Sequence, residues 1–127
     1  MVYDNFVQKV KRQDPRNIFE PCNTDLSFIP QRLRAFYKLY NPVDVEVVMA
    51  DSTSIRLCPV GYLKKLQLEY PIDRTAFIFA TKEGDAIYLM PGGIYTRTHV
   101  STVNKHTKIA DSFDAFIEMI NIEMLKR

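Results

Sequence analysis

The sequence has no apolar run that approaches the roughly 18 residues needed to cross a membrane. Its N-terminal segment, Met1 to Phe6, lacks the basic and then apolar arrangement of a secretory signal. Cysteine is scarce: Cys22 and Cys58 stand far apart, and two such cysteines in a chain that is not secreted are more often free thiols than a disulfide. We therefore expect a cytoplasmic protein with reduced thiols and no membrane partner.

Charge of one sign is also lacking. Seventeen basic and fifteen acidic residues leave a net charge of +2, which creates no field strong enough to argue for nucleic acid or an anionic membrane. The 127 residues fit one domain, and a hydrophobic share of 46% with a charged share of 25% is that of an ordinary globular protein. We predict a single domain over residues 1–127.

The segment from Phe77 to Met90 is the centre of the predicted fold. Two apolar, β-branched and aromatic runs, Phe77 to Ala80 and Ala86 to Met90, flank a short polar turn, and this pattern predicts a β-hairpin. Both runs are too continuously apolar for a strand with one wet face, so both faces should be covered. Gly84 can supply the positive φ of the turn, and Pro91-Gly92-Gly93 indicates a second reversal into Ile94 to Thr98.

Helical periodicity appears on both sides of this meander. Apolar residues recur at helical spacing near both ends of the chain, Asp14-Pro15 ends the first helix, and Asn41 is suited to a left-handed cap that ends the second. Asp111 or Ser112 provides the N-cap of the last helix. The predicted apolar stripes are Tyr3, Phe6, Val7 and Val10; Leu33, Phe36, Tyr37 and Tyr40; and Phe113, Phe116, Ile117, Ile120 and Met124.

The remaining segments have weaker patterns. Val43 to Met49 and Ile55 to Leu57 alternate as a hairpin with one wet face, residues 98–109 fit an edge strand or hairpin, and Asn17 to Asp25 is predicted as a connector. The segment from Tyr62 to Tyr70 fits both the helical and the strand periodicity, and a short helix or irregular crossing is favoured. This order predicts an α+β domain with an antiparallel sheet of about five to six strands, packed by N-terminal and C-terminal helices.

No set of residues forms a recognisable catalytic or metal motif. Cys22, Cys58, His99 and His106 are residue types that zinc prefers, yet they lack its usual spacings, and a Cys-His nucleophilic pair is not singled out either. Cys58 is better explained as a small buried hydrophobe. We expect no catalytic residues, no metal and no cofactor.

Two charged groups deserve an alternative interpretation. Glu83 and Asp85 around Gly84 could be paired carboxylates, but acidic residues beside glycine are ordinary turn residues. A basic set on the first two helices has the composition of a nucleic-acid site, although charges in this number are usually solvated helix faces. That set is Lys9, Lys11, Arg12, Arg16, Arg32 and Arg34.

Four segments, in this order, resemble the SUKH superfamily of Smi1/Knr4-like proteins. They are Ile29-Pro30 with Leu33 to Asn41, then Phe77 to Ile87, then Gly93 to Tyr95, and finally Ala110 to Ile117. The resemblance implies an α+β fold with no catalytic site. It further implies a protein-binding role: bacterial members are mostly inferred to be immunity proteins that neutralise a cognate toxin, often a nuclease, and fungal members act as regulatory scaffolds.

The resulting hypothesis is a non-enzymatic module that binds a protein partner, a cognate toxin above all. Because nuclease toxins present basic clefts, acidic residues near strand ends are the predicted contact residues: Asp44, Glu46, Glu83 and Asp85. The alternatives are a binder of nucleic acid or of an anionic ligand that uses the basic helices, and a regulatory scaffold. No small-molecule substrate is expected.

Overall fold

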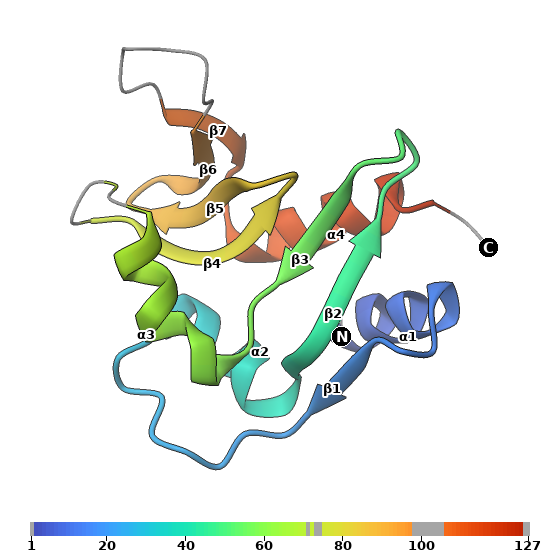
Figure 1. Cartoon of the computed structure of the whole chain (residues 1–127), viewed down its shortest axis with the longest axis horizontal. Coiled ribbons are helices and arrows are strands. Elements are labelled where there is room, and N and C mark those ends of the chain that lie inside the picture. Colours follow the sequence, from blue (N-terminus) through green and yellow to red (C-terminus); the bar gives the residue numbers. More distant parts are fainter. Residues whose placement is uncertain (1, 71, 73–74, 98–105, 126–127) are drawn as a thin grey trace.

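The structure is a computed structural model that describes residues 2–70, 72, 75–97 and 106–125. Within these residues the chain is an α+β fold of four helices and a seven-stranded antiparallel sheet (Figure 1). None of the described helices is long and apolar enough to span a membrane. In chain order the elements are α1 (Val2–Gln13), β1 (Ile18–Glu20), α2 (Gln31–Leu39), β2 (Asn41–Val48), β3 (Ser54–Leu57), α3 (Val60–Glu69), β4 (Phe77–Lys82), β5 (Asp85–Met90), β6 (Gly93–Arg97), β7 (His106–Ala110) and α4 (Phe113–Glu123).

The sheet is a simple meander in which each strand pairs with the next strand in the sequence, from β1 to β7. The β4–β5 hairpin lies at its centre, as predicted, and the residues from Ile78 to Ala80 and from Ala86 to Leu89 are buried. Their continuous apolar sequence follows from this position, since side chains on both faces of these strands are covered.

The turn between β4 and β5 contains two residues in the left-handed region. Lys82 pairs with Asp85, so Glu83 and Gly84 form a two-residue loop with φ values of +49° and +87°. Positive φ at both positions is the pattern of a type I′ turn, whose twist matches that of the flanking strands. The positive φ of Gly84 was predicted, whereas that of Glu83 was not.

All four helices share one hydrophobic core with the sheet. The predicted stripes of α1 and α4 are buried, and Ser112 is the N-cap of α4, since its hydroxyl accepts a hydrogen bond from Ala115 N at 3.0 Å. Phe79 of β4 contacts Phe113 and Phe116 of α4, each with ring centroids 5.5 Å apart. In Figure 1, α4 accordingly passes behind the strands.

Three sequence expectations require correction or refinement. The segment predicted as a connector contains β1, a strand of three residues that pairs with β2 and raises the strand count to seven. Asn41 adopts no left-handed cap; it begins β2, and its side-chain oxygen accepts a hydrogen bond from Val60 N at 2.9 Å. The ambiguous segment is helix α3, which starts at Val60 and buries Leu63 and Leu66. In the first two cases a tertiary contact outweighed a weak local pattern.

Two buried amide side chains hold the N-terminal segment against the sheet. Gln13 accepts a hydrogen bond from Val48 N at 2.8 Å and donates to the carbonyls of Val48 and Leu125 at 2.7 and 2.9 Å. Asn17 donates to the Val10 carbonyl at 3.1 Å and accepts from Glu46 N at 3.0 Å. These bonds give partners to Val48 N, Glu46 N and the Leu125 carbonyl, whereas the carbonyls of Val48 and Val10 also accept from Leu125 N and Asp14 N.

Replacing Gln13 with leucine should therefore destabilise the protein. The substitution keeps the size of the side chain but removes the partner of Val48 N and of the Leu125 carbonyl, while the Val48 carbonyl keeps its bond from Leu125 N. We therefore expect a loss of about 2–4 kcal/mol in the free energy of unfolding. Urea unfolding measures the change, provided that the dependence of the free energy on urea concentration is the same in both proteins. The control is Gln8→Leu at an exposed position of the same helix, where a change within about 0.5 kcal/mol is expected. Equal effects at the two positions would contradict this role of Gln13.

Two glycines should respond to alanine in opposite directions. Gly93 has a φ of +149°, and a Cβ there would lie 2.4 Å from the Ala110 carbonyl oxygen of β7. Gly93→Ala should cost about 2 kcal/mol or more, because backbone must move. Gly61 lies in α3 with open space around its Cβ position, so Gly61→Ala should stabilise by up to about 1 kcal/mol. Thermal unfolding of both variants tests the sign, and a stable Gly93→Ala protein would refute the close approach of β6 and β7.

Candidate functional site

One face of the sheet carries exposed or partly exposed side chains, most of them polar, over β1 to β4. Ile18 lies opposite Asp44, Glu46 lies opposite Arg56, and Arg56 lies opposite Thr81. Residues directly opposite each other on paired strands share a face, as do residues two apart on one strand. We call this set of five residues the open face.

The open face is accessible and rigidly supported. The side chains of Asp44 and Arg56 are 71% and 55% exposed, and Ile18 is 45% exposed, which is high for an isoleucine. On the opposite face, Val45 and Val47 are fully buried in the core. The alternation in β2 therefore fixes which side chains reach solvent.

Charges on the open face are of mixed sign. Arg56 and Asp44 form a long ion pair of 3.9 Å, which contributes little to stability at this exposure. Arg16 precedes β1 and pairs with Asp14 at 2.8 Å. The Asp14 carboxylate, and more weakly those of Asp44 and Glu46, raise the pKa of the Arg16 guanidinium. Asp44 and Glu46 therefore lie within electrostatic reach of one arginine.

The other two predicted contact residues occupy a different place. Glu83 and Asp85 lie at the β4–β5 turn, where the Glu83 carboxylate accepts a hydrogen bond from Ser54 N at 2.7 Å. This bond ties the turn to the first residue of β3. The structure thus brings Asp44 and Glu46 together on β2 and gives Glu83 a local role in the turn.

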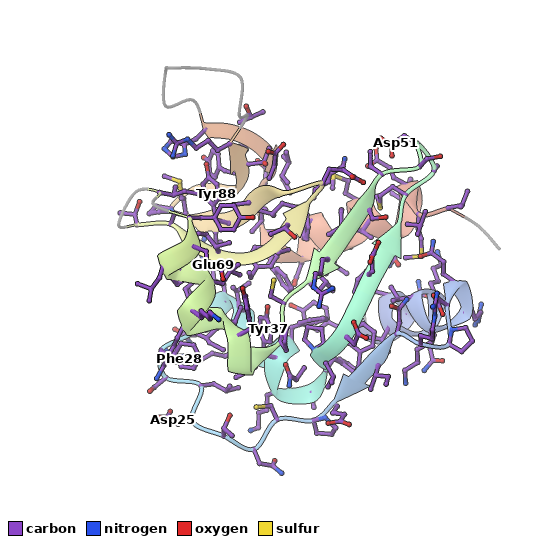
Figure 2. All side chains as sticks on the ribbon, in the orientation of Figure 1. Asp25, Phe28, Tyr37, Asp51, Glu69 and Tyr88 are labelled. Atoms are coloured by element: carbon purple, nitrogen blue, oxygen red, sulfur yellow. The ribbon has the colours of Figure 1, made fainter. Side chains whose placement is uncertain are left out.

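A cleft of about 390 Å³ adjoins the open face and lies between the sheet and α3. Sequence reasoning missed it, because a helix and two strands form it together. The hydroxyl of Tyr62 donates a hydrogen bond to the Glu69 carboxylate, and that of Tyr70 donates to the Gly84 carbonyl at 3.0 Å. Figure 2 labels Glu69 on α3. Side chains that line this α3 cleft include Arg56 and Thr81 from the strands, Tyr62, Leu66 and Glu69 from α3, and Tyr70, which follows α3.

Gln67 fixes the position of α3 against β4. Its side-chain amide donates to the Ile78 carbonyl at 2.7 Å, and its oxygen accepts from Ile78 N at 2.8 Å. Ile78 lies beyond Ala80, the last residue of β4 that pairs with β3, so the glutamine supplies hydrogen bonds that β3 does not offer there. The walls of the α3 cleft are therefore held together by specific hydrogen bonds.

Cys58 lines the cleft but has the properties of a core residue. It is 4% exposed, and its carbonyl accepts a hydrogen bond from the Tyr37 hydroxyl at 3.3 Å. Burial raises the pKa of the Cys58 thiol to about 11, although nearby Arg56 acts in the opposite direction. At neutral pH the thiol is protonated, and only a thiolate is a strong nucleophile.

The other candidates for chemistry are dispersed or lie elsewhere. Cys22 contacts the Thr24 hydroxyl at 3.0 Å in the segment before α2, while His106 of β7 contacts the hydroxyl of Tyr88. His99 lies outside the described residues. Among the side chains that the structure describes, no three His, Cys, Asp or Glu residues are placed to hold a metal ion.

The predicted basic set is only partly available to a ligand. Arg16 is paired with Asp14, and Arg34 donates hydrogen bonds to the carbonyls of Ile29 and Ser27 at 2.7 and 3.1 Å. Lys11 and Arg12 remain exposed on α1. Two of the arginines thus stabilise local structure, which weakens the case for a continuous basic surface.

Alkylation should distinguish the two cysteines. We expect iodoacetamide to modify partly exposed Cys22 well before buried Cys58. Because only the thiolate reacts, the rate at Cys58 should rise about tenfold per pH unit up to its raised pKa. Peptide mass spectrometry measures the two sites separately. A rate at Cys58 that levels off near pH 8 would contradict the raised pKa.

Comparisons of the chain with protein-family models, with curated proteins and with solved structures find no match.

Proposed function

We propose that this protein is a non-enzymatic binding module that neutralises a cognate toxin by direct contact, as the resemblance to SUKH immunity proteins implies. The observation that carries this proposal is the open face, where Asp44 and Glu46 are exposed beside Ile18 on strands whose other side is core. An exposed apolar residue surrounded by charged ones fits a protein contact surface, which has an apolar centre and a polar rim. Because paired strands already hold the backbone of this face in place, little conformational entropy is lost when it binds a partner.

The charge of the open face favours a basic partner. Asp44 and Glu46 outnumber Arg56 among its charged residues, and Arg56 is already close to Asp44. Acidic groups arranged this way would steer a basic surface, such as the nucleic-acid cleft of a nuclease, toward the sheet. Occlusion of that cleft would then be sufficient for neutralisation, and no bond in the toxin needs to be broken.

Two further observations fit this role. The thiol of Cys58 is protonated at neutral pH, so the residue best placed in the α3 cleft for covalent chemistry is unreactive there. Cys22 and Cys58 are both free thiols, which suits the reducing cytoplasm in which an intracellular toxin would be met. A regulatory scaffold would use the same face for a different partner.

The direct test is co-expression with the product of a neighbouring toxin-like gene. We expect the two proteins to co-purify and the toxin to lose its toxicity in cells that express this chain. Association should slow as salt concentration rises, since exposed acidic groups act mainly on the rate of encounter. A chain that neither binds such proteins nor protects cells would contradict the proposal.

Charge reversal on the open face should weaken the complex. The variant Asp44→Lys with Glu46→Lys removes both acidic groups, and we expect association with a basic toxin to fall roughly tenfold or more. The matched control is Glu118→Lys with Glu123→Lys at two exposed positions of α4, which changes the net charge by the same amount. Surface plasmon resonance measures both variants. If the control weakens binding as much as the open-face variant, net charge is responsible and the open face is not the contact surface.

A further inference from the structure

The α3 cleft has two opposite charges that do not pair with each other. Arg56 extends from β3 and Glu69 from α3, and both line the same cleft of about 390 Å³. Within the described residues, the only ion pair of Arg56 is the 3.9 Å contact with Asp44. The Glu69 carboxylate accepts a hydrogen bond from the Tyr62 hydroxyl. No ion pair joins Arg56 to Glu69 in this part of the chain.

The strand side of the cleft is suited to a carboxylate. Arg56 and Thr81 lie directly opposite each other on β3 and β4, so their side chains share a face. A guanidinium can donate two parallel hydrogen bonds to a carboxylate, and a threonine hydroxyl can donate a third. The 3.9 Å separation from Asp44 is too long for a hydrogen bond and leaves the donors of Arg56 available.

The helix side of the cleft is suited to an ammonium group and an apolar body. The second oxygen of Glu69 can accept from a cation. The hydroxyls of Tyr62 and Tyr70 are both engaged, by Glu69 and by the Gly84 carbonyl, so the two rings are held in place. Leu66 and Cys58 line the same cleft, are buried and add apolar surface.

We propose that the α3 cleft binds a free apolar α-amino acid, with its carboxylate at Arg56 and Thr81, its ammonium group at Glu69 and its side chain toward Leu66. This site goes beyond the proposed function and does not depend on it. A ligand that has only a carboxylate would leave the Glu69 carboxylate without an opposite charge. A ligand that has only an ammonium group would leave the Arg56 guanidinium without one. A zwitterion satisfies both groups, and the cleft volume lies in the range of small-molecule sites.

The test is an NMR titration of the whole ¹⁵N-labelled chain with three related ligands. L-leucine carries both charges, N-acetyl-leucine keeps only the carboxylate, and leucinamide keeps only the ammonium group. We expect leucine to shift amide signals of β3, β4 and α3, and each blocked derivative to bind about tenfold or more weakly. Absence of binding by leucine at 10-fold excess over a protein sample of about millimolar concentration, or equal binding by all three ligands, would overturn the proposal.

Variants assign each charge of the ligand to one residue. Arg56→Gln should weaken the binding of leucine about tenfold or more. It should change the binding of leucinamide little, because leucinamide has no carboxylate for Arg56 to bind. Glu69→Gln should weaken leucine similarly and change N-acetyl-leucine little. Arg32→Gln on α2 and Glu118→Gln on α4 are matched controls at exposed positions outside the cleft.

The pattern across variants also separates this site from the open face. If Arg56→Gln and Glu69→Gln reduce the binding of all three ligands equally, the variants act through general structure and the assignment of charges is wrong. Urea unfolding of each variant identifies a loss of folding. If leucine does not bind, the proposal that Asp44 and Glu46 bind a toxin is unaffected. The two proposals are therefore tested independently.

Discussion

The fold depends on covering one face of the sheet with aromatic side chains from distant segments. Phe36 of α2 is the hub: its ring contacts Tyr3 of α1 and Phe113 of α4, both at 5.3 Å between centroids. Phe113 in turn contacts Phe79 of β4. Such aromatic pairs add directional preference to the burial of apolar area. Helices near both ends of the chain are thereby fixed to the central hairpin, and a hydrogen bond from the Tyr3 hydroxyl to Asp114 connects α1 with α4 directly.

Amide side chains provide the second constraint, because they satisfy backbone groups where regular pairing fails. Gln13 and Asn17 bond to backbone of β2, and Gln67 bonds to Ile78, which lies beyond the last residue of β4 that pairs with β3. A buried backbone group without a partner is costly, so these side chains restrict how α1, β2 and α3 can sit. The position of α3 creates the cleft, and the position of β2 creates the open face.

The two surfaces share Arg56 and Thr81. Strand alternation places Arg56 on the open face beside Asp44, while the neighbouring β3–α3 connection places it at the edge of the α3 cleft. Glu83 shows the contrasting case of a charged residue with a local role. Its carboxylate accepts a hydrogen bond from Ser54 N, and Glu83 itself adopts a positive φ in the turn. A carboxylate at a strand end is therefore available to a partner only where the local backbone does not use it.

The sequence alone determined the elements with a strong local period: the central hairpin, the stripes of α1 and α4, and a cap at Asp111 or Ser112, of which the structure has Ser112. Local patterns are sufficient there because hydrophobic spacing and capping act within a few residues. Tertiary structure decided the rest. β1 exists because β2 supplies its hydrogen bonds, and Asn41 bonds to Val60 N rather than ending a helix in the left-handed region. Arg56 and Glu69 share a cleft only because α3 packs against the sheet, and long-range packing of this kind leaves no periodic signal in the sequence.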